Sequence, residues 1–111
     1  MNITVEARHM EVTDAIRDYA RSKAAKLPRY YDNVQSVEVI LDIDADRFVV
    51  EMVVTAKRKS TFVATHRGDD MYACIDQCMD KIVQQLSRHK DRVRNRHGPP
   101  HGQTLRETAG E

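Results

Sequence analysis

Basic side chains near the C-terminal end of the chain have the types and spacing to bind a charged partner. Lys81, Arg88 and Arg92 are separated by seven and four positions, and Lys90 and Arg94 by four. On a helix these spacings place each group in a longitudinal row, away from the apolar stripe that would face the core. Phosphates of a folded RNA are regularly spaced, so rigid rows of cations suit them. The alternative is a solvated helix end whose cations favour the helix dipole.

The distribution of charge favours a local binding surface, although the whole chain has a net charge of only +1. Residues 81–97 hold six Lys or Arg against one Asp, while residues 1–80 have a net charge of −3. Such a block can attract a polyanion to a nearly neutral molecule. Lys26 and Arg29, at the far end of an earlier helix, add two cations. Because A-form RNA hides its base edges, we expect contacts with shape and backbone more than with sequence.

Two motifs resemble metal sites but lack parts that such sites require. The acidic stretch 42–46 imitates the start of an EF-hand, yet Arg47 and Val53 stand where the loop needs Gly and Glu. Cys74 and Cys78 would need two more converging ligands to bind zinc. We expect both cysteines to be small buried residues of the core.

The sequence contains no recognisable catalytic constellation. His66 has no nucleophile beside it, and there is no Gly-rich phosphate loop. The few aromatic residues form no strand pattern for base stacking of the RRM type. We therefore expect no enzymatic activity, no catalytic residue, no metal site and no cofactor.

Hydrophobic periodicity predicts the elements that must position the basic residues. Alternating apolar residues indicate strands, and apolar residues three and four positions apart indicate amphipathic helices. Thr13 and the segment 68–70 are suitable helix starts, and Pro28 ends or kinks the first helix. In chain order, the expected elements are a strand at 2–7, a helix from 13 to 28, strands at 36–43, 48–56 and 62–66, and a helix from 71 to 97.

This order, β-α-β-β-β-α, predicts an α+β two-layer sandwich with two helices on one face of a four-stranded mixed sheet. The first two strands should be parallel because a right-handed crossover connects them, and the other pairs should be hairpins. At 1.5 Å per residue the last helix is about 40 Å long, so its basic end should extend beyond the sheet. We expect a single α+β domain over residues 1–97, followed by a flexible polar tail over 98–111.

Composition favours a cytoplasmic protein. No apolar stretch approaches the roughly 18 residues of a membrane span. The first residues contain neither the basic nor the apolar region of a signal peptide. The two cysteines form no disulfide framework. We therefore expect a cytoplasmic location and no membrane partner.

Three segments of the chain form a pattern that is specific to one protein family. They are Met1–Thr4 with Glu11–Arg17, Ala25–Leu27 with Tyr30–Asp32, and Gly68–Asp76 continuing through Asp80–Ile82 to Gln85–Arg92. In these segments the chain resembles the ribosome hibernation-promoting factors, also called ribosome-associated inhibitors or subunit-interface proteins. The resemblance covers residues 1 to about 96. It implies the β-α-β-β-β-α fold that periodicity also predicts.

The resemblance also implies a function. Members of the family bind the small ribosomal subunit and its rRNA in the channel for mRNA and tRNA, which silences translation under stress or in stationary phase and protects idle ribosomes. The rRNA-binding positions would fall on Lys26, Lys81, Arg88, Lys90, Arg92 and Arg94. Arg29 extends this set on the charge argument alone. Gln84 stands where relatives often carry Arg or Lys, so one phosphate contact is expected to be missing or moved.

Further expectations concern the partners. The chain resembles the short form of the family, which either pairs ribosomes together with a separate ribosome modulation factor or holds single ribosomes idle. The tail at 98–111 favours neither role. We expect a monomer in solution. The alternative from another functional class is a protein-interaction module that docks its basic helix on an acidic protein partner.

Overall fold

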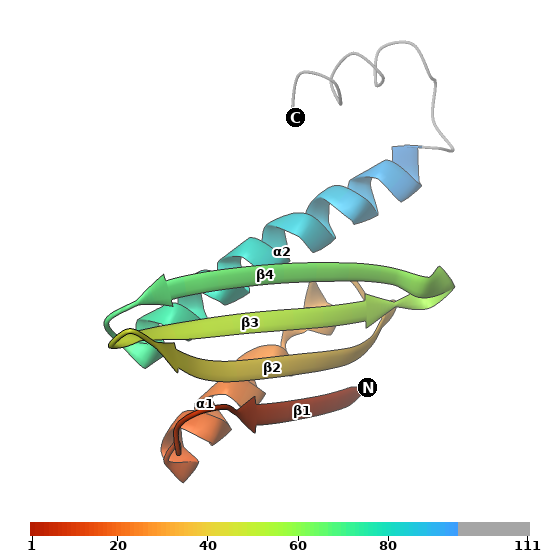
Figure 1. The fold of residues 1–111 in the computed structure, drawn as a ribbon. Coiled ribbons are helices and arrows are strands. Elements are labelled where there is room, and N and C mark those ends of the chain that lie inside the picture. The colour runs from red at the N-terminus through yellow and green to blue at the C-terminus, as the bar shows by residue number, and fades with distance from the viewer. Residues whose placement is uncertain (96–111) are drawn as a thin grey trace.

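The computed structural model describes residues 1–95, with side chains up to Val93, and follows the order β-α-β-β-β-α (Figure 1). The elements are β1 (Asn2–Ala7), α1 (Asp14–Ala24), the 3-10 turn η1 (Leu27–Arg29), β2 (Val34–Asp44), β3 (Arg47–Ala56), the 3-10 turn η2 (Lys57–Lys59), β4 (Ser60–Gly68) and α2 (Met71–Asn95). The tail expected at 98–111 lies outside the described residues, as does the side chain of Arg94.

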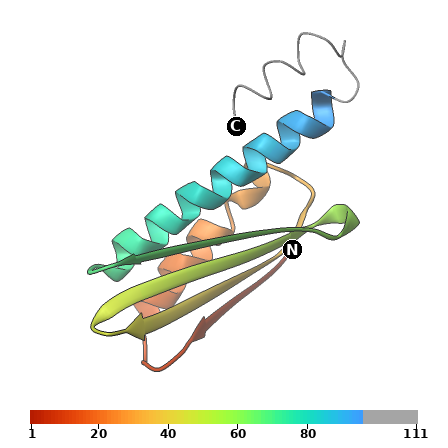
Figure 2. The same ribbon diagram turned by 45° about the horizontal axis from the view of Figure 1, so that its top comes forward.

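The four strands form one mixed sheet in the order β1-β2-β3-β4. β1 is parallel to β2, with Val5 opposite Val39. The other two pairs are antiparallel, with Val39 opposite Met52 and Met52 opposite Ala64. Both helices lie on the same face of the sheet and run in the same direction (Figures 1 and 2). The predicted α+β sandwich and its strand pairing are therefore confirmed.

The alternation of apolar and polar residues decides which face of each strand enters the core. Val39 and Leu41 of β2 and Met52 of β3 are fully buried against the helices. Their neighbours point to the open face of the sheet. Ile40 also belongs to the open face, where it lies in register between Glu6 and Glu51, yet it is only 7% exposed.

Side-chain caps fix the starts of both helices where the sequence predicts them. The hydroxyl of Thr13 accepts a hydrogen bond from Ile16 N–H at 3.1 Å, and the carboxylate of Asp70 accepts one from Tyr72 N–H at 3.0 Å. These N–H groups have no partner within the helix. Each cap stabilises its helix by about 1 kcal/mol.

The first helix is shorter than its apolar spacing predicts. α1 ends at Ala24, and the chain continues into η1, where Pro28 stands in the first turn. Proline has no N–H, and its ring clashes with the preceding turn of an α-helix, whereas the start of a helical segment tolerates it. Leu27, the first residue of the turn, and Tyr31, which follows it, still lie in the core.

The core fixes only part of α2. Cys74, Ile75, Ile82 and Leu86 are buried against the sheet, and Leu86 is the last buried side chain of the helix among those described. Beyond it α2 continues past the β4 edge of the sheet (Figure 1). Within residues 1–95, no helix combines the length and the apolar composition needed to cross a membrane.

Candidate nucleic-acid interface

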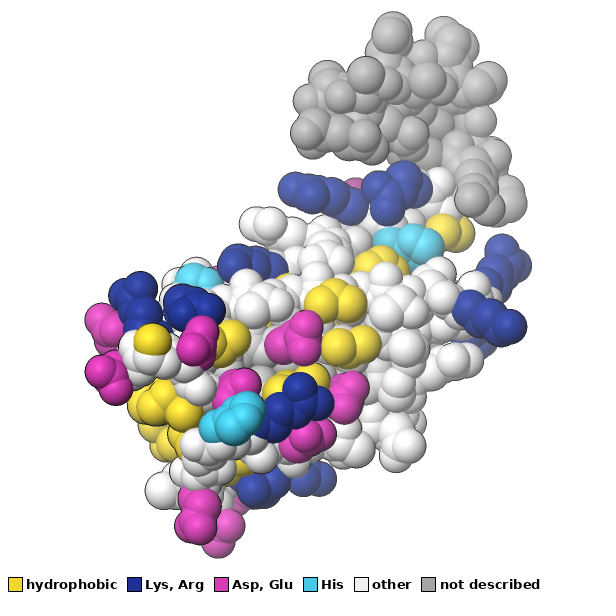
Figure 3. Space-filling model, in the orientation of Figure 1, with side chains coloured by type: hydrophobic (Ala, Val, Ile, Leu, Met, Phe, Trp, Pro, Cys, Tyr) yellow, Lys and Arg dark blue, Asp and Glu magenta, His cyan; other side chains and the backbone are white. Residues whose placement is uncertain are grey.

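Cations gather at the end of the molecule where η1 follows α1 and where α2 extends beyond the sheet. We define the basic surface by five residues with exposed or partly exposed side chains: Lys26, Arg29, Arg88, Lys90 and Arg92. The first two come from the segment after α1 and the other three from α2. In Figure 3 dark blue side chains follow this part of α2.

The cations of the basic surface are available to a partner. Within the described part of the chain, none of the five takes part in an ion pair. An exposed cation without a carboxylate partner can exchange its counterions for a phosphate without first breaking a contact within the protein. Arg88 and Arg92 stand four residues apart on one helix, so the helix holds them in a row.

Lys81, which the sequence predicts in the same row, has a second role. Its Nζ donates a hydrogen bond to Thr65 O at 2.7 Å, and Gln85 Nε2 donates one to Val63 O at 2.9 Å. Both acceptors belong to β4, which is an edge strand of the sheet. Lys81 therefore ties α2 to that edge. An ammonium group has three donors, so two remain for a phosphate.

Ring contacts around His89 hold the later turns of α2 against the rest of the molecule. The His89 ring centroid lies 5.2 Å from that of Tyr31 and 5.2 Å from that of Phe62, edge to face in both cases. Tyr31 follows η1, and Phe62 belongs to β4. The segment after η1, β4 and α2 thus meet at His89, which directly follows Arg88 and lies less than one helical turn before Arg92. Their place relative to η1 is thereby set.

A second contact joins the two helices near the N-terminal end of α2. The Tyr19 hydroxyl donates a hydrogen bond to the Asp76 carboxylate at 2.6 Å, and Lys23 Nζ lies 3.5 Å from the same oxygen. The Tyr72 ring packs edge to face on that of Tyr19, with centroids 5.0 Å apart. The hydrogen bond to Asp76 and desolvation raise the pKa of Tyr19, and the Asp76 charge raises the pKa of Lys23. This contact fixes the position of α1 relative to α2, and Lys26 and Arg29 follow α1 directly.

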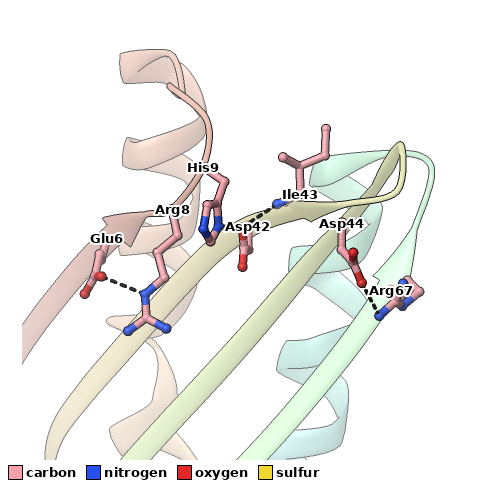
Figure 4. A network of polar contacts seen from close by, with 7 residues as sticks. All are labelled: Glu6, Arg8, His9, Asp42, Ile43, Asp44 and Arg67. Carbon is pink, nitrogen blue, oxygen red and sulfur yellow. Dashed lines mark hydrogen bonds and ion pairs between the residues drawn. The ribbon is translucent and has the colours of Figure 1, made fainter.

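Basic side chains at the opposite end of the sheet are paired with acids. Figure 4 shows three such pairs, Arg8 with Glu6 at 2.8 Å, His9 with Asp42 at 2.9 Å, and Arg67 with Asp44 at 3.1 Å. The hydrogen bond with His9, followed by one from Ile43 N–H, lowers the pKa of Asp42. Because each basic side chain has an acid beside it, this end attracts a polyanion less strongly than the basic surface does.

The turn between β3 and β4 brings three more cations to the end that carries the basic surface. Lys57, Arg58 and Lys59 are exposed, and Lys57 N–H donates a hydrogen bond to Asn33 O at 3.1 Å, shortly after η1. The sequence pattern indicates only a turn here. The signal that could have found them is a run of cations in a hairpin, where Gly and Asn are usual.

No group of three or more His, Cys, Asp or Glu side chains within the described residues is placed to hold a metal ion. Cys74 and Cys78 are buried in the core, which confirms the sequence prediction. Burial raises the pKa of both thiols, that of Cys78 to about 12. A thiol with such a pKa stays protonated at neutral pH and is a poor ligand and nucleophile.

Comparison with known proteins covers the domain and its basic surface together. The family model described as Sigma 54 modulation protein / S30EA ribosomal protein matches residues 3–94. The chain belongs to this family. The match includes all four strands and both α-helices, and every residue of the basic surface lies within it.

Two similar proteins are named ribosome hibernation promoting factor. The protein from Azotobacter vinelandii is 34% identical over 92 residues, which cover 83% of this chain and 85% of the relative. The protein from Escherichia coli K12 is 31% identical over 94 residues, which cover 85% of this chain and 98% of the relative.

Solved structures of similar proteins support the S30EA fold. A ribosomal subunit interface protein from Coxiella burnetii has a TM-score of 0.73 and 28% identity, covering 82% of this chain and 99% of its own. The N-terminal domain of Protein Y from Thermus thermophilus has a TM-score of 0.71 and 33% identity, covering 80% and 99%. The sequence-based family resemblance is therefore confirmed.

Proposed function

We propose that this chain silences idle ribosomes by binding the small ribosomal subunit in the channel that mRNA and tRNA use. The family and the names of its relatives support the coarser statement, that the protein is a ribosome-associated hibernation factor. The basic surface and Lys81 would contact the phosphates of ribosomal RNA, and Arg94 would extend the row along α2. The protein would act by occupying a site, without catalysis, and in the cytoplasm, where ribosomes work.

One observation supports the proposed contact with RNA. Arg88 and Arg92 lie on a helix that extends beyond the sheet, and neither has an acidic partner within the described residues. A rigid helix end with free cations can enter a narrow channel lined with phosphates. Ring contacts at His89 and the hydrogen bond between Tyr19 and Asp76 keep that end in place without using either arginine.

Sedimentation with purified small subunits tests the proposal. The double variant Arg88→Gln, Arg92→Gln removes two cations that contact nothing in the core. We expect it to stay folded and to lose at least tenfold in affinity, because about two phosphate contacts disappear. Wild-type binding should fall when deacylated tRNA is added, since both would occupy the same channel.

The control variant carries the same change of charge at the other end of the sheet. Arg47→Gln with Arg67→Gln removes two cations that are paired with Asp69 and Asp44. We expect its affinity for small subunits to stay within twofold of the wild type. Equal losses in both double variants would contradict a localised contact. If tRNA does not reduce wild-type binding, the proposed binding in the channel is contradicted, and docking on an acidic protein of the subunit is favoured.

A further inference from the structure

The hairpin turn between β3 and β4 carries positive charges that do not stabilise the fold. Lys57, Arg58 and Lys59 follow one another, and all three side chains are exposed. Within the described residues none of them forms an ion pair, and none belongs to the hydrophobic core. Three adjacent cations repel one another, so this composition does not stabilise the turn.

The backbone of the turn is also unfavourable for the residues that occupy it. Arg58 has φ 65° and ψ 29°, and Lys59 has φ 61°. In this left-handed region Cβ crowds the backbone, so Gly and Asn are the usual residues. Two consecutive positive φ angles are typical of a type I′ hairpin turn, for which Asn-Gly is the favoured pair. Long cations at strained positions point to a role outside the fold.

The position of the turn indicates what that role is. Lys57 N–H is hydrogen-bonded to Asn33 O, and Phe62, near the start of β4, packs on His89 of α2. The turn therefore lies at the end of the sheet where α2 carries the basic surface. Figure 1 shows the hairpin tip at this end, and Figure 3 shows dark blue side chains there without magenta ones beside them.

We propose that the tip of the β3–β4 hairpin is a second contact for RNA phosphates on the small ribosomal subunit. The inference rests on the proposed function and extends it to residues on a different element. The Tyr31–His89–Phe62 ring contacts join α2 to β4, the strand that follows the hairpin tip, and so hold the two groups of cations in one unit. Two such groups match two separate runs of phosphates in a folded RNA better than one run.

A turn replacement tests the tip without endangering the fold. The variant Arg58→Asn, Lys59→Gly gives the turn its favoured residue pair and removes two cations. We expect a higher melting temperature and, at the same time, weaker binding to purified small subunits. The slope of log affinity against log salt should become shallower by about 1.4 to 1.8, at about 0.7 to 0.9 per phosphate contact.

Two control variants separate charge from backbone geometry. The β2–β3 turn has the same pair of positive φ angles, at Ala45 (50°) and Asp46 (69°), and contains no cation. Ala45→Asn with Asp46→Gly should raise the melting temperature and leave subunit binding and its salt slope unchanged. Exchanging the two cations, Arg58→Lys with Lys59→Arg, keeps the charge and should bind as the wild type does.

The outcomes distinguish this inference from the proposed function. The tip contact is supported if, among the turn variants, only Arg58→Asn, Lys59→Gly binds small subunits more weakly and has a shallower slope of log affinity against log salt. Unchanged affinity and slope in that variant overturn it. If the Arg88→Gln, Arg92→Gln variant still loses affinity in that case, the proposed function is retained and only the contact at the hairpin tip is rejected. Wild-type protein that does not bind small subunits would overturn both.

Discussion

Side chains of one chemical type have different roles in this protein according to what they touch. Arg88 is exposed and has no acidic partner among the described residues, whereas Lys81 donates a hydrogen bond to the edge strand, and Lys23 is held by Asp76. Residue type and helical spacing place Lys81 and Arg88 in one row. Only the packing of α2 along β4 shows that Lys81 also joins the helix to the sheet through a hydrogen bond.

Lys81 and Arg88 should therefore differ when each is changed to Met. Lys81→Met removes a cation together with the hydrogen bond to Thr65 O. We expect it to weaken subunit binding and to lower the free energy of unfolding by about 0.5 kcal/mol, a small effect because the contact is exposed. Arg88→Met should weaken binding only. Urea unfolding and subunit sedimentation on the same samples would measure both, and equal stability losses would contradict the distinction.

The buried cysteines should behave as apolar core residues whose protonation affects stability only in alkali. The pKa of Cys78 is about 12 in the folded protein, against an ordinary value of 9.0. The unfolded thiol ionises first, so the stabilisation present below pH 9 is lost as pH rises toward 12. At pH 8 we expect thiol reagents to label neither Cys74 nor Cys78 until urea unfolds the protein. Rapid labelling of the native protein would contradict this.

Replacing both cysteines tests the same interpretation by another route. Cys74→Ala with Cys78→Ala should lower the free energy of unfolding by about 1–2 kcal/mol, because two small buried groups are trimmed. Ribosome binding should stay unchanged at a temperature where the variant is folded. A stoichiometric metal in the native protein, lost with binding in the variant, would show the interpretation to be wrong.

Among the elements, the two helices owe their relative position to a few contacts. Tyr19 on α1 donates a hydrogen bond to Asp76 on α2, and the basic surface spans both helical segments. A change in their separation would alter the distance between Lys26 and Arg88. Contacts away from the cations can therefore affect binding.

The Tyr19 hydroxyl should matter more than that of Tyr72, although the two rings are in contact. Tyr19→Phe loses the hydrogen bond to Asp76 and leaves the carboxylate with Lys23 alone, so we expect a loss of about 1 kcal/mol in unfolding free energy. Tyr72 makes no side-chain hydrogen bond within the described residues, so Tyr72→Phe should be nearly neutral. Equal effects of the two substitutions in urea unfolding would contradict this assignment.

Periodicity predicts the elements well because it reflects which face of each element is buried. The alternation around Val39 and Met52 predicts the core faces of β2 and β3, and Thr13 marks the start of α1. Periodicity does not predict that Ile40, on the open face, is almost fully buried. Its burial depends on which residues of β1 and β3 lie beside it, and the register of the sheet decides that. The end of α1 at Ala24 is also missed, since the apolar spacing continues through η1.

Local patterns predict less of the candidate site than of the fold. The row of cations on α2 follows from spacing within a single helix. The approach of the β3–β4 turn to that helix does not, because it depends on how Phe62 and Tyr31 meet His89 across the sheet and the helix layer. Partners that are distant in sequence leave no mark in periodicity or in local charge.

At the scale of the whole molecule, side chains from the helices cover both edges of the sheet. Arg17 Nη1 donates a hydrogen bond to Val5 O of β1 at 2.9 Å, and Lys81 and Gln85 donate to carbonyls of β4. Unpaired edge strands are sites where another chain can add a strand. A cation or an amide at each edge disfavours such pairing.

We therefore expect a monomer in solution, and a loss of this protection when the caps of one edge are removed. Analytical ultracentrifugation should show the monomer mass for the wild type at micromolar concentration. The variant Lys81→Ala, Gln85→Ala frees two carbonyls of β4 and should associate measurably as its concentration rises. A wild-type dimer under these conditions would mean that another surface, such as the open face near Val63, brings two copies together.

The position of the basic surface, away from the side chains that are paired with acids, also has a kinetic consequence. The basic surface and the hairpin tip lie at one end of the molecule, and the paired charges of Figure 4 lie at the other. Such a protein has a permanent dipole, and the field of a ribosome would turn it during diffusion so that its basic end arrives first. Added salt should then slow association more than it speeds dissociation. The arrangement of charge would thus decide how quickly an idle ribosome is found, as well as how firmly it is held.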